Sequence, residues 1–279
     1  MSLVLFLTPY SEMAEVTRDL AEEMGFHLKI VESALDEAIE MIQDLVKADP
    51  DAILVSRGAT ADLAAKDFPN TKLVRADPTE IDIAEALVEA RKRGERIGVL
   101  GSATPEMKEK IQRISAILAL EVHGFWYTNS VEFARQIELA RSTGIQVVVG
   151  GGQRGELMCN QRGIEHIKLL SGRETIRQAL VRAKDIVETQ AKERDNAAFV
   201  RMVVENINEG IIAVDEHQVV TLFNPTAAAL FQMAPGEVIG RSLSDLSFRR
   251  SLPALFEGGV PEIGEIHDIL GARILVNRV

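Results

Sequence analysis

Four short loops, each placed directly after an apolar run, carry the residue types with which this chain could bind a small anion. They read LTPYSE (7–12), SRGATA (56–61), GSATPE (101–106) and GGGQRG (150–155). Arg57 supplies a planar guanidinium that matches a carboxylate in geometry. Hydroxyl groups come from Ser56, Thr60, Ser102 and Thr104. Because glycines in these loops allow a ligand close to the backbone, the four loops predict a cleft for a small anion.

Tight turns and helix caps are the competing interpretation of these loops. Every α/β domain needs glycines and hydroxyl side chains where its helices begin. For a single loop this purely structural role is the simpler explanation. Four loops of the same kind make ligand binding an equal alternative, and the residue types alone leave both open.

The loop GGGQRG also fits the dinucleotide-binding pattern G-x-G-x-x-G. That pattern requires an acidic residue about 20 positions further on, at the end of the next strand. The chain has Leu, Ser and Gly there, at 170–172. An ATP-binding P-loop would need Lys and then Ser or Thr after Gly155, where Glu156 and Leu157 stand instead. We therefore expect neither a dinucleotide nor ATP at this loop.

Phosphoryl transfer and enzymatic catalysis lack the residues that they need. A receiver domain has acidic residues after its first strand and a phosphate-accepting Asp after its third, but here those positions hold Thr8 and Pro9, and Ser56 and Arg57. The histidines and the single Cys159 offer neither metal-ligand spacing nor a nucleophile beside a base. We expect no catalytic residue, no metal and no enzyme. The alternative is a small α/β enzyme that acts on a carboxylate in the same cleft.

Composition limits the other classes of function. The chain has 279 residues, 46% of them hydrophobic, which suits about two domains with cores of their own. Its formal net charge of −11 would repel a phosphate backbone, so we expect no nucleic-acid binding by these residues. One cysteine excludes an internal disulfide, and no apolar run approaches the roughly 20 residues of a membrane span. We therefore expect a cytoplasmic protein without membrane contact.

Apolar runs alternate with segments of helical spacing over the first two-thirds of the chain. The runs stand at 3–7, 27–31, 52–56, 72–76, 97–101, 120–127, 146–150 and 166–170. This alternation predicts parallel sheets with helices on both faces. Segment 76–87 has the pattern of a crossover between two sheets. We predict a domain at 1–173 with α/β lobes at roughly 1–76 and 77–170, and the helix after Ser171 could return to the first lobe.

A long helical linker is predicted at 174–207. Its seam residues alternate at spacings of three and four: Ile176, Ala179, Ala183, Ile186, Gln190, Glu193, Ala197, Val200, Val204 and Ile207. Such a seam is typical of a parallel coiled coil and therefore predicts a homodimer. A surface helix that packs its apolar stripe on its own domain is the alternative.

The composition changes again at 208–279. Two strand patterns, GIIAVD and QVVTLFN, are joined at Glu216 and His217, and Asn224 and Pro225 are placed as the cap and first residue of a helix. With the following VIGRSL turn, this order resembles the start of a PAS domain. The residues up to Val279 supply only one or two further strands, so we expect an incomplete α+β PAS domain. No histidine or cysteine suits haem or flavin, so no cofactor is expected.

The first two-thirds of the chain resemble a known sensory domain. The segments AILVSRGATADL, PTEIDIAEAL, RIGVLGSAT and VVVGGGQRGELMCNQRGIEHIKLLSGRETIRQAL resemble the N-terminal domain of the propionate catabolism activator (PrpR) family of sigma-54-dependent transcription regulators. The resemblance covers most of residues 1–190. It implies a two-lobed, chelatase-like α/β fold and a small carboxylate effector similar to 2-methylcitrate. By the same matching, the effector-binding residues are Ser56, Arg57, Gly58, Thr60, Ser102, Thr104, Gly151 and Gly152.

The resemblance also implies a route for the signal. The effector would close the two lobes, the helix at 174–207 would shift, and a dimeric PAS domain would pass this change to an output domain. The family's AAA+ ATPase module and helix-turn-helix module have no counterpart in these 279 residues. Contacts with ATP, DNA and sigma-54 RNA polymerase are therefore expected in a continuation of the chain.

Overall fold

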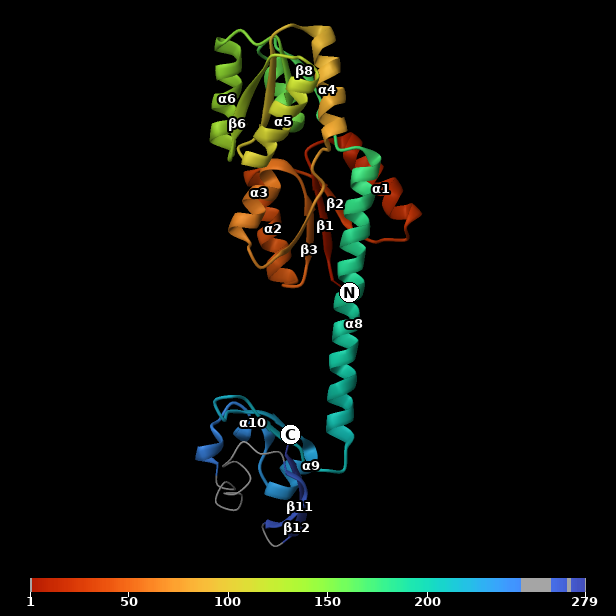
Figure 1. Cartoon of the computed structure of the whole chain (residues 1–279), viewed down its shortest axis with the longest axis vertical. Coiled ribbons are helices and arrows are strands. Elements are labelled where there is room, and N and C mark those ends of the chain that lie inside the picture. The colour runs from red at the N-terminus through yellow and green to blue at the C-terminus, as the bar shows by residue number, and fades with distance from the viewer. Residues whose placement is uncertain (1, 247–261, 270–271, 279) are drawn as a thin grey trace. The chain divides into compact units, whose positions relative to one another are not determined.

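The computed structural model describes residues 2–246, 262–269 and 272–278. The chain forms two compact units, Met1–Ala191 and Lys192–Val279. The first unit contains two four-stranded parallel sheets, with strand orders β2-β1-β3-β4 and β6-β5-β7-β8 (Figure 1). The predicted α/β class with two lobes and parallel sheets is confirmed.

Each lobe alternates strands and helices along the chain. Lobe 1 contains β1 (Val4–Thr8), α1 (Ser11–Glu23), β2 (Lys29–Glu32), α2 (Asp36–Ala48), β3 (Ile53–Ser56), α3 (Gly58–Asp67) and β4 (Lys72–Arg75). Lobe 2 contains α4 (Glu80–Arg93), β5 (Ile97–Ser102), α5 (Pro105–Ile117), β6 (Val122–Tyr127), α6 (Ser130–Ser142), β7 (Val147–Gly150), α7 (Gly152–Asn160) and β8 (Glu165–Ile167). The last strand is shorter than the predicted run at 166–170, because the chain leaves the sheet after Ile167.

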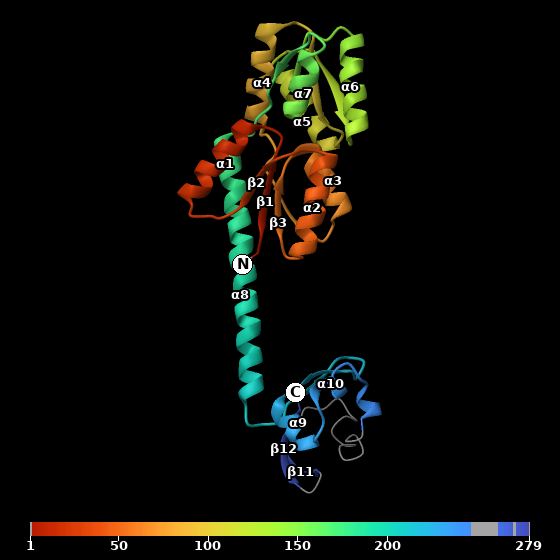
Figure 2. The ribbon, with the colours of Figure 1, turned by 180° about the vertical axis from the view of Figure 1, so that it is seen from behind.

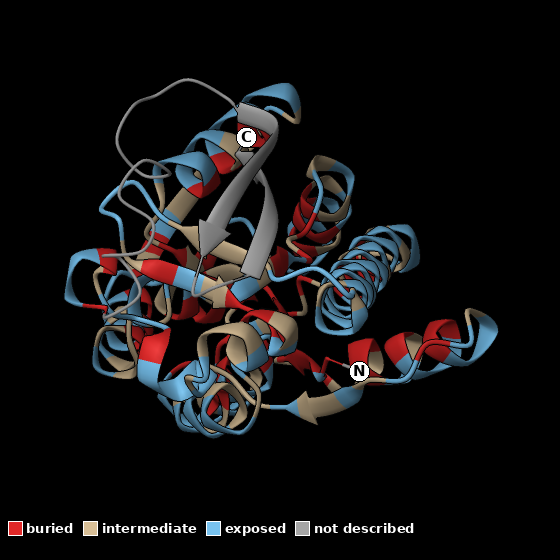
Figure 3. Ribbon diagram, turned by 90° about the horizontal axis from the view of Figure 1, so that it is seen from below, coloured by how far each residue is buried: buried red, intermediate tan, exposed pale blue. Residues whose placement is uncertain are grey.

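The most apolar runs of the sequence form the central strands. Every residue of β1, β3 and β7 is buried, whereas the edge strands β2 and β4 carry exposed residues at both ends. A central parallel strand has helices on both faces, so neither face selects polar residues. In Figure 3 the buried residues accordingly lie along strands and on one side of the surrounding helices.

Two crossovers connect the lobes. The chain passes from β4 to α4 through residues 76–79 and returns from β8 through residues 168–172. The Ser171 hydroxyl donates to the Ala76 carbonyl oxygen at 2.6 Å, which ties one crossover to the other. Asp82 completes a capping box with Thr79 at the start of α4 and also accepts the Gly172 N–H at 3.1 Å. The two crossovers are therefore hydrogen-bonded to each other where the lobes meet.

Helix α8 (Arg173–Asn206) begins by packing on lobe 1, next to α1 (Figures 1 and 2). Its buried residues in the lobe 1 core are Ile176, Ala179, Leu180, Ala183 and Val187. The Gln190 side chain donates to the Asp51 carbonyl oxygen at 3.1 Å. The predicted return of this helix to the first lobe is confirmed. The predicted seam therefore packs on the chain's own lobe from Ile176 to Gln190, and this half cannot also pair with a second helix.

The second unit begins with the remainder of α8, in which residues 192–203 are all exposed. It continues with β9 (Ile212–Val214), β10 (Val220–Phe223), α9 (Pro225–Phe231), α10 (Pro235–Val238), the 3-10 helix η1 (Leu243–Asp245), β11 (Glu262–Ile269) and β12 (Ala272–Arg278). Strands β9 and β10 pair antiparallel, as do β11 and β12. Residues 247–261 of the expected PAS range lie outside the described residues.

Asn224 holds the start of this unit together. Its side-chain oxygen accepts the Ile211 N–H at 2.8 Å and the Ala227 N–H at 2.9 Å. Its amide donates to the carbonyl oxygens of Val204 at 3.1 Å and Glu209 at 2.8 Å. The predicted helix cap is therefore confirmed, and the same side chain also joins α9 to the end of α8.

No helix within the described residues has both the length and the apolarity to cross a lipid bilayer.

Replacing Leu180 tests whether α8 belongs to the lobe 1 core. Leu180 is 0% exposed, whereas its neighbour Val181 is 43% exposed. We expect Leu180→Ala to lower the free energy of unfolding of the first unit by about 2–5 kcal/mol, because a cavity opens in a packed core. Val181→Ala should change it by about 0.5 kcal/mol or less. Urea denaturation followed by circular dichroism measures both, and equal effects would contradict this packing.

Candidate functional site

The strand order of each lobe brings the four predicted loops to one cavity. In an open α/β sheet, ligands bind beyond the carboxyl ends of the strands, where the order reverses. That position lies between β1 and β3 in lobe 1 and between β5 and β7 in lobe 2. Residues at the ends of these four strands line a cavity of about 650 Å3 between the lobes. This volume suits a small-molecule ligand.

Six of the eight predicted site residues line this cavity: Arg57, Gly58, Thr60, Ser102, Gly151 and Gly152. Ser56 and Thr104 are not among the lining residues. Ser56 is buried at the end of β3, and its hydroxyl has no hydrogen-bond partner in the described structure. The Thr104 hydroxyl accepts the Met107 N–H at 3.3 Å and caps α5, so the helix-cap interpretation accounts for this residue.

Arg57 places a buried cation on the cavity wall. The residue is 9% exposed and lines the cavity. Its Nη1 donates to the Met13 sulfur at 3.2 Å. A thioether is a weak, neutral acceptor and cannot compensate the charge. Burial lowers the pKa of the Arg57 guanidinium, as desolvation does for any cation.

Neighbouring carboxylates do not pair with Arg57. Asp77 exerts the strongest electrostatic effect on it of any carboxylate. However, the Asp77 oxygens accept the Gly58 N–H and the Arg75 Nε–H, both at 2.6 Å. Among the described residues, no ion pair joins Arg57 to an acidic side chain. The cavity therefore presents an uncompensated positive charge to whatever enters it.

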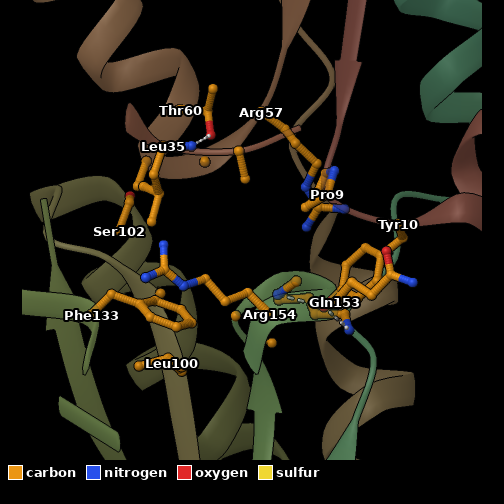
Figure 4. Close-up of a pocket in the computed structure, with 18 of the residues that line it drawn as sticks. Pro9, Tyr10, Leu35, Arg57, Thr60, Leu100, Ser102, Phe133, Gln153 and Arg154 are labelled. Carbon is orange, nitrogen blue, oxygen red and sulfur yellow. Dashed lines mark hydrogen bonds between the residues drawn. The ribbon is translucent and has the colours of Figure 1, made fainter. Parts of the chain in front are cut away.

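Arg154 contributes a second cation, from lobe 2. It is exposed, its Nη1 donates to the Ser130 hydroxyl at 3.3 Å, and its guanidinium lies 5.8 Å from the centre of the Phe133 ring. Figure 4 shows Arg57 and Arg154 extending into the cavity from opposite sides. The two arginines therefore suit a ligand with more than one anionic group.

Tyr10 connects the two lobes at the cavity. Its hydroxyl accepts the N–H groups of Gly152 at 3.1 Å and Leu169 at 3.4 Å. The Gln153 N–H donates to the Pro9 carbonyl oxygen at 3.0 Å. Gly152 has φ of +69°, and a Cβ there would lie 2.9 Å from the Pro9 Cβ. Close contact between the lobes thus requires glycine at this position.

An ion cluster also connects the two lobes. Lys168, in the second crossover, pairs with Glu12 of α1 and, at 3.4 Å, with Glu156 of α7. The hydrogen bond from Lys168 lowers the pKa of Glu12. These groups are partly exposed, so the cluster adds little stability compared with the buried Tyr10 contacts.

Tyr127 lines the cavity at the end of β6. Its ring packs edge-to-face on Phe133, with centroids 4.9 Å apart. Burial raises the pKa of the Tyr127 phenol, so the hydroxyl is neutral and can donate a hydrogen bond. In the part of the chain that the structure describes, no protein group accepts from this hydroxyl. It is therefore available to a ligand oxygen.

Helix starts at the cavity differ from those elsewhere in lobe 2. Helices α3 and α7 have Arg57 and Gly151 as N-cap residues, and neither side chain forms a capping hydrogen bond. In contrast, Thr79, Thr104 and Asn129 cap α4, α5 and α6. Other groups accept the first N–H of α3 and of α7: the Asp77 carboxylate accepts that of Gly58, and the Tyr10 hydroxyl accepts that of Gly152. Both helices begin at the cavity, so the positive ends of their dipoles favour negative charge there.

Sequence reasoning missed the loop between β2 and α2. Glu32, Ser33, Ala34 and Leu35 line the cavity, although the segment carries no glycine or conspicuous polar motif. Leu35 is buried with φ of +55°, and its N–H donates to the Thr60 hydroxyl at 2.9 Å (Figure 4). A positive φ is costly for a side chain of this size. Tyr10 and Arg154 stood in two of the predicted loops but were not singled out.

The cavity offers little acid–base or metal chemistry. Its lining residues include no His, Cys, Lys or Asp. Over residues 2–246, 262–269 and 272–278, no group of three or more His, Cys, Asp or Glu side chains could hold a metal ion. Burial raises the pKa of Cys159 to about 11, so this thiol is not a ready nucleophile. These side chains favour anion binding over acid–base or metal chemistry.

Comparisons with known proteins assign both parts of the chain to known families. The sequence profile of a family described as "Propionate catabolism activator" matches residues 22–193, and that of the PAS fold matches residues 198–262. No match was found among curated proteins.

Two solved structures were compared with this chain, and one of them shares its fold. An NtrC family transcriptional regulator from Clostridium acetobutylicum superposes with a TM-score of 0.59 and 20% identity, over 68% of this chain and 99% of that chain. A conserved domain protein from Vibrio cholerae has a TM-score of 0.42 and 12% identity, over 68% and 84% of the two chains. At 20% identity, the first likeness establishes a shared fold.

The two tyrosines of the chain allow a matched test of the lobe contact. Tyr10→Phe should lower the free energy of unfolding by about 1–3 kcal/mol, because the N–H groups of Gly152 and Leu169 lose their acceptor. Tyr127→Phe removes a hydroxyl without a protein partner and should change it by about 0.5 kcal/mol or less. Thermal and urea unfolding measure both variants. A larger effect for Tyr127→Phe would contradict the assigned contacts.

Proposed function

This chain belongs to the propionate catabolism activator family and is a sensory input region of a regulator, and we propose that it senses a small carboxylate in the cavity between its lobes. The effector expected from the resemblance is a tricarboxylate similar to 2-methylcitrate. The observation that carries this proposal is the Arg57 guanidinium, which is 9% exposed, lines the cavity and has no carboxylate partner among the described residues.

Several features of the cavity support a carboxylate. A bidentate pair with a carboxylate would compensate the Arg57 charge, and such charge-assisted bonds are stronger than the present bond to sulfur. Arg154 offers a second anchor from lobe 2, and the Tyr127 phenol offers a neutral donor. Glu32 and Glu37 also line the cavity but are exposed, so solvent screens their repulsion. A ligand that engages both lobes would favour their closed arrangement.

We propose that the signal leaves through α8. The helix starts in the lobe 1 core and continues into the unit that contains the PAS-type hairpin. By the resemblance to sigma-54-dependent activators, the output would lie in an AAA+ ATPase and a helix-turn-helix module outside residues 1–279. DNA, ATP and sigma-54 RNA polymerase would be their partners. The net charge of −11 supports a role of these residues in sensing rather than in binding nucleic acid.

We also propose a homodimer through the exposed part of α8 and the PAS unit. The seam residues left after lobe 1 packing are Glu193, Ala197, Val200, Val204 and Ile207. Val203, about 60° around the helix from Val200, is also exposed. An apolar helical face of this length is stable when a second helix covers it.

Arg57 gives the decisive test of effector binding. With citrate and 2-methylcitrate as probes, we expect Arg57→Met to weaken binding by about 10- to 100-fold, because a charged group that would hydrogen-bond to the carboxylate is lost. Arg154→Met should weaken it by about 5-fold or less, because the residue is exposed. Isothermal titration calorimetry measures the affinities. Since Arg57→Met removes an uncompensated buried charge, the ligand-free variant should be at least as stable as the wild type.

Two outcomes of that experiment would argue against the proposal. Unchanged carboxylate affinity in Arg57→Met would show that the anion binds elsewhere. Consumption of citrate or 2-methylcitrate, followed by NMR over hours, would favour the alternative of a small α/β enzyme that acts on a carboxylate in the same cleft. Propionate, which has a single carboxylate, should bind more weakly than either probe if both arginines contribute.

The dimer is tested by two aspartates at equally exposed positions. Val200 and Met202 are each 59% exposed, but Met202 lies about 200° further around the helix, away from the seam. We expect Val200→Asp to convert a dimer to a monomer in size-exclusion chromatography with light scattering, because it places charge at the seam. Met202→Asp should remain dimeric. A monomeric wild type, or the same result for both variants, would contradict the proposed interface.

A further inference from the structure

The buried guanidinium of Arg57 donates a hydrogen bond to a sulfur atom. Its Nη1 donates to the Met13 Sδ at 3.2 Å, and Met13 is 2% exposed. Thioether sulfur accepts hydrogen bonds weakly and carries no charge. The Met13 contact therefore holds the guanidinium in place but leaves the charge uncompensated, and a carboxylate would easily replace the sulfur.

Met13 lies on α1, which is tied to α8. Glu23 of α1 pairs with Arg173 and, at 3.0 Å, with Arg177 of α8. The Lys184 side chain donates to the Met24 carbonyl oxygen at 3.1 Å. Figures 1 and 2 show the two helices side by side in opposite views. A displacement of α1 is therefore a displacement of the start of α8.

The core around Met13 also includes α8. Met13, Tyr10, Ile176, Ala179 and Leu180 belong to one buried hydrophobic cluster of lobe 1. Such interiors are close-packed, so a side chain that changes its position moves its neighbours. Met13 is thus in contact with the cavity cation on one side and belongs to the α8 core on the other.

We propose that Met13 is the positioning residue that holds Arg57 in its ligand-free position and couples occupancy of the cavity to α8. This proposal rests on the proposed function, since a carboxylate in the cavity is what draws the guanidinium away from the sulfur. Loss of that contact lets Met13 repack in the core and shifts the α1–α8 pair. Ligand binding is coupled to α8 because Arg57 has a different partner in the ligand-free and the ligand-bound state.

Two substitutions at Met13 have opposite expected effects on affinity. Met13→Leu keeps the side-chain volume but removes the hydrogen-bond acceptor of Arg57. Because Arg57 then loses no hydrogen bond when citrate binds, citrate should bind about 3- to 10-fold tighter. Met13→Gln places an amide oxygen, a stronger acceptor, beside Arg57, and citrate should bind more weakly by a similar factor. Met24→Leu is the matched control, because Met24 packs against the same cluster without contacting Arg57.

Two measurements separate coupling from a purely structural role. Isothermal titration calorimetry with citrate gives the affinity, and hydrogen exchange of the α8 amides at 176–187, with and without citrate, gives the response of the helix. We expect wild type and Met24→Leu to show a citrate-dependent change in exchange. Met13→Leu should bind citrate yet lose at least about half of that change, because the guanidinium no longer acts on residue 13.

The outcomes distinguish the two proposals. If wild type binds citrate and both Met13 variants keep its affinity and its α8 response, the role of Met13 is overturned and carboxylate sensing stands. If neither citrate nor 2-methylcitrate binds to wild type or to Met24→Leu, both proposals fall. Circular dichroism checks that each variant folds. Should Met13→Gln fail to fold, Met13→Leu decides the question alone, by whether it binds citrate and yet loses the citrate-dependent change in α8 hydrogen exchange.

Discussion

The structure of the first unit depends on one constraint: two parallel sheets with the same strand order are joined so that the carboxyl ends of their strands meet. The two crossovers enforce this, and the hydrogen bond from Ser171 to the Ala76 carbonyl oxygen fixes one to the other. Because polar loops follow the strand ends, the meeting place collects helix starts, glycines and the Arg57 side chain. The cavity is therefore a consequence of how the sheets are connected.

Several residues that line the cavity lack interaction partners or have strained backbone. In the described structure Arg57 has no counter-ion, Tyr127 has no acceptor, and Leu35 is held at a positive φ. Each feature is unfavourable for an isolated domain. An anion between the lobes would relieve the first two together.

Much of this arrangement was predictable from the sequence, because it follows from local pattern. Runs that are apolar throughout became central strands, and the loops after them became the cavity wall. Asn224 became a helix cap because its side chain suits that position. Local pattern does not distinguish Thr104, which caps a helix, from Thr60, which faces the cavity, since both hydroxyls follow a strand and precede or begin a helix.

Features that depend on distant parts of the chain were not predictable. Tyr10 meets Gly152 only because the sheets face each other, and nothing in the loop at 7–12 indicates that contact. The heptad spacing of α8 suits a coiled coil and a helix packed on its own sheet equally well, and the lobe 1 core decided the outcome up to Gln190. Leu35 lines the cavity because it follows β2, which is adjacent to β1, a pairing that periodicity does not specify.

The placement of the aromatic residues has an optical consequence. The chain has only two tyrosines, and both line the cavity, whereas its single tryptophan, Trp126, is not among the lining residues. Phenol absorption and emission of this protein therefore arise wholly at the contact between the lobes. The tyrosine component of near-ultraviolet difference spectra, once separated from the overlapping Trp126 absorption, thus reports on that contact with no label attached.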